Sequence, residues 1–207
     1  YALPSPREIP LKTIQRLVHG DARRLAGMAD ASVDLVVTSP PYPMVGMWDA
    51  GFAADDPRVA DALDADDGPA AFELMHESLD AAWAACFRVL RPGGFLCVNI
   101  GDATRSIGGL FRLFANHARI LEAFRRIGLA TLPDILWRKQ TNAPNKFMGS
   151  GMLPAGAYAT YEHEYVLIAR KGLPRTFDDA DAKALRRRSA YFFEERSVWF
   201  SDLWQDV

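Results

Sequence analysis

Residues 33–42 of the chain read VDLVVTSPPY, and this stretch decides how the fold is interpreted. Residues 33–38 form a nearly continuous run of aliphatic and β-branched side chains, which is typical of a buried parallel strand. The tetrapeptide Ser-Pro-Pro-Tyr follows at 39–42 without a break. In an open parallel sheet, ligands bind beyond the carboxyl ends of the strands. The sequence therefore predicts a strand that carries a rigid loop to a ligand-binding site.

The residues of this loop suit the recognition of a nucleobase. Its two prolines fix the backbone φ angle and remove two backbone donors, so the carbonyl groups around Ser39 and Pro40 remain as rigid acceptors. An exocyclic amine carries two N–H donors, and a base taken out of a duplex stacks on an aromatic ring such as that of Tyr42. The alternative is a stiff turn with Tyr42 at its rim. The preceding strand and the Gly-Asp pair at 20–21 favour the first interpretation.

Helical and strand patterns alternate along the rest of the chain. Apolar residues at helical spacing predict helices at 22–28, 69–90 and 113–127, and apolar runs predict strands at 95–100, 130–137 and 164–169. Prolines, glycines and acidic residues at 39–67 predict a long mobile loop. Strands that alternate with helices predict an α/β fold with a mostly parallel sheet flanked by helices.

The composition is that of an ordinary globular chain. It has 207 residues, 49% of them hydrophobic and 24% charged, which suits one domain with a sizeable core. No apolar run reaches the roughly 18–20 residues needed to span a membrane, and no signal peptide is recognisable. Cys86 and Cys97 lie in apolar segments and predict buried thiols in a reducing compartment. These features predict a cytoplasmic protein without a membrane or metal site.

Charge is distributed unevenly between the two halves of the chain. Residues 1–100 hold 8 Lys and Arg against 14 Asp and Glu, whereas residues 101–207 hold 16 against 12. A nucleic-acid partner is therefore expected mainly on the second half. The candidate DNA contacts are Lys139, Asn145, Lys146, Arg186, Arg187 and Arg188. A plain loop is the alternative for 145–146, and a solvated helix face is the alternative for 186–188.

Several segments occur in a distinctive order. An apolar-Gly-Asp element, a helical pattern and the Ser-Pro-Pro-Tyr loop occupy 17–42, and Leu-Arg-Pro-Gly-Gly-Phe stands at 90–95. Trp-Arg-Lys follows at 137–139 and Glu-His-Glu-Tyr at 162–165. This order resembles the DNA amino-methyltransferases, which modify cytosine N4 or adenine N6. It resembles in particular the permuted group, in which the target-base loop precedes the cofactor motif. The resemblance covers about residues 14–172.

The resemblance implies a Rossmann-like fold dependent on S-adenosylmethionine, with double-stranded DNA as substrate. Residues 1–172 would form the catalytic core, and residues 173–207 a basic, aromatic segment where DNA recognition begins. By its position, Asp21 would contact the adenine amino group of the cofactor, with Thr38 and Ser39 beside it. The alternative for Asp21 is the N-cap of the helix predicted at 22–28.

The mechanism implied by the resemblance is direct methyl transfer. Acceptors at Ser39 and Pro40 would orient the exocyclic amine for in-line attack on the sulfonium methyl group. Neither cysteine stands in a Pro-Cys loop, which disfavours the C5-cytosine mechanism and its cysteine nucleophile. Serine at position 39 favours cytosine N4, because aspartate there is commoner among adenine enzymes. The catalytic residues would be Ser39, Pro40, Pro41 and Tyr42.

One part of the family pattern is absent. The glycine-rich cofactor loop, Asp-Pro-Phe-x-Gly-x-Gly, follows the recognition region in the permuted group, which places it beyond Val207. We therefore expect a further C-terminal segment or a second chain to complete the cofactor site, and a homodimer is compatible with the sequence. The alternative is a non-catalytic DNA-binding or regulatory relative, but the intact loop at 39–42 favours an enzyme.

Two polar segments are open to more than one interpretation. Asn99 closes a predicted strand, where it would either border the site or form an Asx turn. Glu162, His163 and Glu164 alternate across a strand and offer no clustered metal ligands, so strand polarity is the expected reason for them.

Overall fold

The computed structural model describes residues 13–139, 148–149 and 152–205 of the chain. Its centre is a six-stranded sheet of order β1-β2-β9-β6-β10, with β5 also paired to β9. The sheet strands are β1 (Val33–Thr38), β2 (Leu90–Ile100), β5 (Leu129–Thr131), β6 (Ile135–Arg138), β9 (His163–Lys171) and β10 (Leu203–Trp204). Strand β9 runs antiparallel to β2, β5 and β6, whereas the other five strands share one direction. The α/β class is confirmed, and the sheet is mixed through this one reversed strand.

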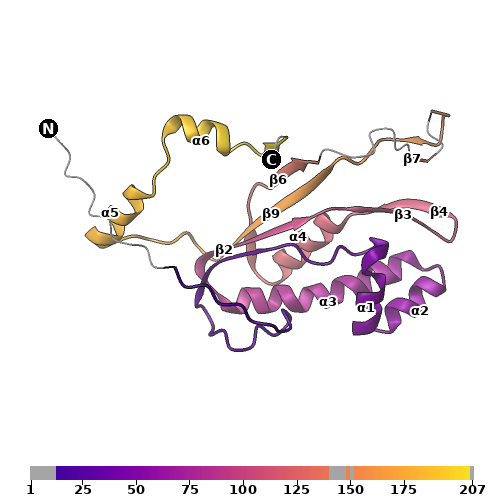
Figure 1. Ribbon diagram of the computed structural model, residues 1–207, viewed down its shortest axis with the longest axis horizontal. Helices are drawn as coiled ribbons and strands as arrows, with labels where there is room; N and C mark the ends of the chain where they lie inside the picture. Colours follow the sequence, from indigo (N-terminus) through magenta and orange to yellow (C-terminus); the bar gives the residue numbers. More distant parts are fainter. Residues whose placement is uncertain (1–12, 140–147, 150–151, 206–207) are drawn as a thin grey trace.

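Two helices cover one face of the sheet (Figure 1). Helix α3 (Gly68–Val89) begins after Asp67, whose carboxylate accepts a hydrogen bond from the backbone N–H of Ala70. Its apolar face is the one predicted, with Met75 and Trp83 buried in the core. Helix α4 (Asn116–Arg126) packs beside it and against β5 and β9. Gly128 follows α4 with a φ of 87°, a left-handed conformation that glycine adopts readily and that ends the helix.

The segment predicted as a long mobile loop, 39–67, is largely helical. It contains the 3₁₀ turn η1 (Gly46–Trp48), helix α1 (Asp49–Asp55) and helix α2 (Arg58–Asp64). The prediction was wrong because each short helix buries one apolar anchor, Phe52 in α1 and Val59 in α2. Packing of these anchors against α3 outweighs the turn-forming and acidic residues around them.

The helix predicted from residue 113 starts later, because a hairpin precedes it. Strands β3 (Ala103–Ile107) and β4 (Leu110–Phe114) pair antiparallel around a Gly-Gly turn. A second short hairpin joins β7 (Met148–Gly149) and β8 (Ala157–Tyr158). Both hairpins project at the same end of the molecule (Figure 1), and the rings of Phe111 and Tyr158 stack with centroids 5.2 Å apart.

The segment before β1 differs from its prediction. Residues 22–28 form turns and not a helix. The backbone leaves the right-handed helical region here, because Leu25 and Gly27 have φ angles of 43° and 85°. The Arg88 guanidinium donates to the carbonyls of Arg24, Leu25 and Met28 and so ties these turns to α3. Strand β1 is parallel to β2 as predicted, but it is not buried.

Strand β1 stands at the edge of the sheet, and none of the described residues pairs with its outer side. Leu35 and Val37 are accordingly 53% and 72% exposed. The C-terminal segment contains helices α5 (Ala180–Arg188) and α6 (Phe193–Trp199). No helix within the described ranges is both long and apolar enough to cross a membrane.

Candidate active site

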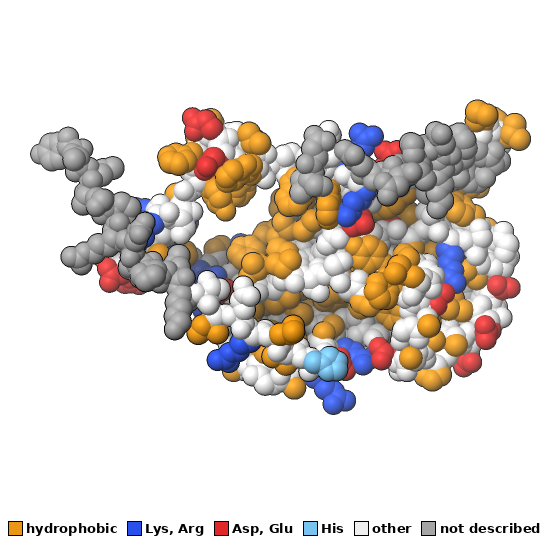
Figure 2. Space-filling model, viewed as in Figure 1, with side chains coloured by type: hydrophobic (Ala, Val, Ile, Leu, Met, Phe, Trp, Pro, Cys, Tyr) orange, Lys and Arg blue, Asp and Glu red, His pale blue; other side chains and the backbone are white. Residues whose placement is uncertain are grey.

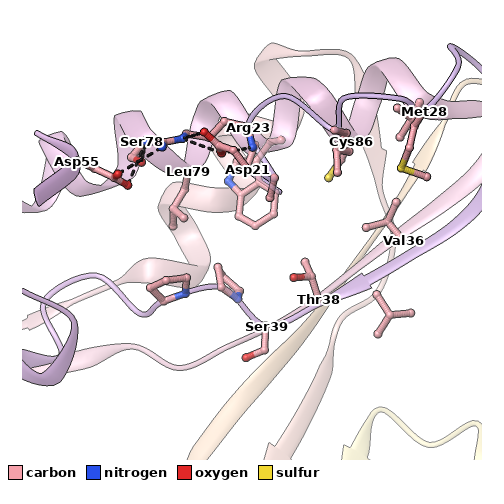
Figure 3. A pocket seen from close by; sticks show the side chains of 18 of the residues that line it. Asp21, Arg23, Met28, Val36, Thr38, Ser39, Asp55, Ser78, Leu79 and Cys86 are labelled. Atoms are coloured by element: carbon pink, nitrogen blue, oxygen red, sulfur yellow. Dashed lines mark hydrogen bonds and ion pairs between the residues drawn. The ribbon is translucent and has the colours of Figure 1, made fainter. Parts of the chain in front are cut away.

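The loop at 39–42 leaves β1 at the carboxyl edge of the parallel strands, where the sequence placed it. Beside it lies a cavity of about 710 Å³ between β1, α3 and the turns at 22–28. Ser39, Pro40 and Pro41 line this cavity together with Thr38 and Asp21 (Figure 3). The structure thus brings the predicted cofactor residues and three of the four loop residues to one space. Tyr42 lies elsewhere.

Asp21 is held by an ion-pair chain at the rim of this cavity. Its carboxylate accepts from the backbone N–H of Arg23 at 2.9 Å and from Arg23 Nε at 3.0 Å. The guanidinium also pairs with Asp55 at 3.0 Å, which ties the turn to the end of α1 (Figure 3). The hydrogen bond from the Arg23 side chain lowers the pKa of Asp21, so the carboxylate is ionised near neutral pH. Asp21 caps a turn and not the predicted helix.

The cavity wall is mainly apolar and includes Cys86 of α3. Burial raises the pKa of Cys86 to about 11 and also raises the pKa of Cys97 on β2. Both thiols are therefore protonated near neutral pH, and a protonated thiol is a poor nucleophile. No cluster of three or more His, Cys, Asp or Glu that could hold a metal occurs in the part of the chain that the structure describes.

Tyr42 lines a second, smaller cavity of about 220 Å³, together with Gly101, Lys139 and Glu164. Its ring edge rests against Gly101, where a Cβ atom would lie 3.1 Å from Tyr42 Cε2. Consecutive loop residues therefore face two different spaces, with Ser39 to Pro41 at the larger and Tyr42 at the smaller.

The phenol oxygen of Tyr42 is the centre of a hydrogen-bond network. It donates to Glu164 Oε2 at 3.0 Å and accepts from Asn99 Nδ2 at 2.8 Å and Ser39 Oγ at 3.3 Å. Burial, aided by the neighbouring Glu164 carboxylate, raises the pKa of Tyr42 to about 12. The phenol therefore remains a donor to Glu164 throughout the neutral range.

A buried amide fixes the loop from behind. Asn116, the first residue of α4, donates to the carbonyl of Pro43 at 3.1 Å and to that of Gly101 at 2.9 Å. Its Oδ1 lies 3.0 Å from Nε2 of His76, and both side chains are fully buried. Because the amide nitrogen serves the carbonyls, this contact assigns the Nε2–H tautomer to His76.

The buried His76 is expected to make stability depend on pH. Burial lowers its pKa from 6.5 to about 4, so between these values the unfolded chain binds a proton that the folded chain does not. The free energy of unfolding is then lowered by about 3 kcal/mol as pH falls from 7 to 4. Urea titrations across this range measure the slope. His76→Gln, whose amide can still donate to Asn116, is expected to reduce it; an unchanged slope would contradict this account.

The candidate DNA contacts do not form one surface. Lys139 Nζ lies 3.3 Å from the centre of the Trp137 ring and 3.4 Å from Glu164, beside the smaller cavity. Arg186, Arg187 and Arg188 form the exposed last turn of α5, which follows β9 at the end of the sheet opposite the loop (Figure 1). Asn145 and Lys146 lie outside the described residues.

The sequence patterns did not reveal the residues that hold the loop. The sequence allows Asn99 to border the site or to form an Asx turn, and in the structure it contacts Tyr42. The sequence predicts only strand polarity for Glu164, whose carboxylate accepts from the same phenol. Asn116 and His76 carry no local signal, because their contacts join residues that are 15, 40 and 73 positions apart.

Comparison with known proteins identifies the family. The model of a family described as DNA methylase, which covers N6 and N4 methyltransferases, matches residues 33–207. The chain is 50% identical over 198 residues to the type II methyltransferase M.MthZI of Methanothermobacter thermautotrophicus, covering 95% of this chain and 56% of that protein. It is 48% identical over 210 residues to M.MjaI of Methanocaldococcus jannaschii, covering 96% and 69%. The chain thus spans little more than half the length of M.MthZI.

A solved structure shows the same architecture. A protein of Thermus thermophilus, described as a DNA modification methylase and crystallised with S-adenosyl-L-methionine, superimposes with a TM-score of 0.64 at 32% identity. The match covers 91% of this chain and 67% of that one. It confirms the fold that the sequence resemblance implied. The chain therefore belongs to the DNA methylase family that comprises the N6- and N4-directed amino-methyltransferases.

Proposed function

We propose that this chain contributes the target-base loop of a DNA methyltransferase that transfers the methyl group of S-adenosylmethionine to an exocyclic amine. The observation that carries this proposal is the division of the loop between two cavities. Ser39 and Pro40 face a space that also contains Asp21, whereas the aromatic Tyr42 faces another. The cofactor would thus lie on one side of the tetrapeptide at 39–42 and the nucleobase on the other.

The larger cavity fits the cofactor in size and chemistry. Its volume of about 710 Å³ lies within the range of about 300–1,000 Å³ of small-molecule sites, which are mostly apolar with a few placed polar groups. The Asp21 carboxylate retains acceptor capacity beyond its bonds to Arg23, because an ionised carboxylate has about four acceptor positions. It would accept from the adenine amino group. When bound, the cofactor supplies an electrophilic methyl group.

The residues of the loop would orient the amine. The Pro40 and Pro41 rings remove backbone donors, so that the carbonyls around Ser39 and Pro40 can accept from the two N–H groups. These contacts hold the nitrogen in line for attack, and the Tyr42 ring supplies a stacking face. No step needs a cysteine nucleophile, in agreement with the protonated state of Cys86 and Cys97.

Asp21 gives a direct test of the cofactor site. Asp21→Asn is expected to weaken the binding of S-adenosylmethionine by about tenfold, the usual cost of losing a hydrogen bond to a charged group. Isothermal titration calorimetry on the complete gene product measures this affinity. Asp30→Asn, which removes an exposed carboxylate paired with Arg88, serves as the control. Equal affinities for the two variants would assign Asp21 a structural role only.

Cytosine N4 is the target that we propose, with adenine N6 as the alternative. Serine at position 39 is the feature that favours cytosine. Nucleoside analysis of duplex DNA after transfer of a labelled methyl group decides between them. Label in N4-methylcytosine supports the proposal, whereas label in N6-methyladenine would retain the loop chemistry and refute the choice of base. Because M.MthZI and M.MjaI are type II methyltransferases, we infer a type II modification enzyme acting in the cytoplasm.

We further propose that a segment outside this chain completes the sheet at β1. The outer edge of β1 is unpaired within the described residues, and Leu35 and Val37 are exposed there. Leu17 is fully exposed in the preceding segment. An added strand would pair with this edge and cover the apolar side chains. Hydrogen–deuterium exchange of the complete gene product tests this: slow exchange of residues 33–38 is expected, and fast exchange would refute it.

The surface charge favours approach of DNA from the second half of the chain. Acidic side chains gather over α1 and α2 (Figure 2), where phosphates would be repelled. The aromatic side chains at the start of α6 are exposed, with Phe192, which precedes the helix, at 73% and Phe193 at 78%. We propose Lys139 as a contact near the flipped base and Arg186, Arg187 and Arg188 as a separate contact to phosphates.

A further inference from the structure

Two side chains from distant parts of the chain converge on the loop tyrosine. Asn99 is the next-to-last residue of β2 and Glu164 is the second residue of β9, and these strands are antiparallel neighbours in the sheet. Asn99 stands opposite Val166 in the register, so alternation places the side chains of Asn99, Val166 and Glu164 on one face. This is the face toward which Tyr42 folds back from the end of β1.

One carboxylate oxygen is contacted by three donor groups of this cluster. Glu164 Oε2 lies 3.0 Å from Tyr42 Oη, 2.7 Å from Asn99 Nδ2 and 3.4 Å from Lys139 Nζ. Asn99 Nδ2 also donates to the phenol at 2.8 Å, which closes a triangle of contacts. Ser39 Oγ reaches the same phenol, so the cluster touches both ends of the loop.

Resting on the methyl-transfer function proposed above, we propose that Glu164, with Asn99, is the positioning residue for Tyr42. It fixes the ring at the angle at which a flipped base stacks. Without Glu164 the phenol loses its acceptor, and the ring is free to turn into the smaller cavity that it lines. Gly101 supports the arrangement, because it leaves space for the ring edge.

The proposal requires that Glu164 act through the phenol. Glu164→Ala is then expected to lower kcat for DNA methylation by about tenfold, the scale of one charge-assisted hydrogen bond. Affinity for S-adenosylmethionine should remain unchanged, because Glu164 does not line the larger cavity. Glu164→Gln should retain most of the activity, since its amide oxygen accepts from both donors. Glu77→Ala, which removes an exposed carboxylate of α3 paired with Arg58, is the control expected to retain kcat.

A double-mutant cycle separates positioning from a general structural role. Tyr42→Phe keeps the ring and removes the hydroxyl, and it is expected to lower kcat by about tenfold as well. The double variant Tyr42→Phe/Glu164→Ala should be no slower than either single variant, because both remove one interaction. Losses that multiply to about a hundredfold would overturn the proposal, as would an unaffected Glu164→Ala enzyme.

The same double-mutant cycle can be measured as thermal unfolding midpoints, which does not require an active enzyme. If the shifts in unfolding midpoint of the two single variants are not additive in the double variant, the contact between Tyr42 and Glu164 is supported. Additive shifts would overturn it. A wild-type enzyme that transfers no methyl group would refute the proposed function. The midpoints would still decide whether Glu164 holds Tyr42.

Discussion

Tyr42→Ala is expected to reduce methyl transfer to DNA by about 100- to 1,000-fold. Base–aromatic stacking contributes about 1–3 kcal/mol, and loss of the ring also removes the fixed phenol that Glu164 and Asn99 hold. The cofactor should still bind, because Tyr42 does not line the larger cavity. Single-turnover transfer and calorimetric cofactor binding, measured on the same preparation, check both parts of this expectation.

The matched control for this change is Phe111→Ala. Phe111 is a partly exposed aromatic residue of β4 that stacks on Tyr158, and it lines neither the larger nor the smaller cavity. Its loss should reduce transfer far less than the loss of Tyr42. Equal reductions of methyl transfer in the two variants would show that the loss of any aromatic ring has this effect. The proposed stacking role of Tyr42 would then be refuted.

Asn116→Leu is expected to lower the free energy of unfolding by about 4 kcal/mol. It would leave the carbonyls of Pro43 and Gly101 and the Nε2–H group of His76 buried without partners, and each unpaired group costs about 1–3 kcal/mol. Urea denaturation at pH 7 measures this loss. The expected result is a lower midpoint with an unchanged dependence on urea concentration.

Glu122→Leu provides the comparison on the same helix. Glu122 is exposed on α4, and a surface change of this kind usually alters stability by about 0.5 kcal/mol or less. If Asn116→Leu unfolded at the same urea concentration as Glu122→Leu, the buried amide would not hold the loop. The account of how residues behind the loop fix its position would then be wrong.

Local patterns identified the elements whose side chains carry a clear period. The run at 33–38 and the apolar face of α3 are examples, because β1 and α3 follow directly from them. The α1 and α2 helices escaped prediction because a single buried residue anchors each one, Phe52 or Val59. One anchor in seven residues gives no periodic signal, and acidic residues dominate the composition around it.

The reversed direction of β9 also could not be inferred from its residues. Its apolar run fits a parallel or an antiparallel neighbour equally well, and its position between β2 and β6 depends on the whole chain. Because β9 begins at the loop end of the sheet, it brings Glu164 to Tyr42. The chemistry of the loop was therefore accessible from the sequence, whereas the residues that hold it were accessible only from the topology.

The most direct test of the central claim is transfer of a labelled methyl group from S-adenosylmethionine to duplex DNA by the complete gene product. The account predicts label on an exocyclic nitrogen of cytosine or adenine, strongly reduced by Ser39→Ala and Tyr42→Ala. Absence of label in DNA while the protein binds both cofactor and DNA would contradict it. Label in 5-methylcytosine would contradict it equally, because that product requires a nucleophile that this loop does not contain.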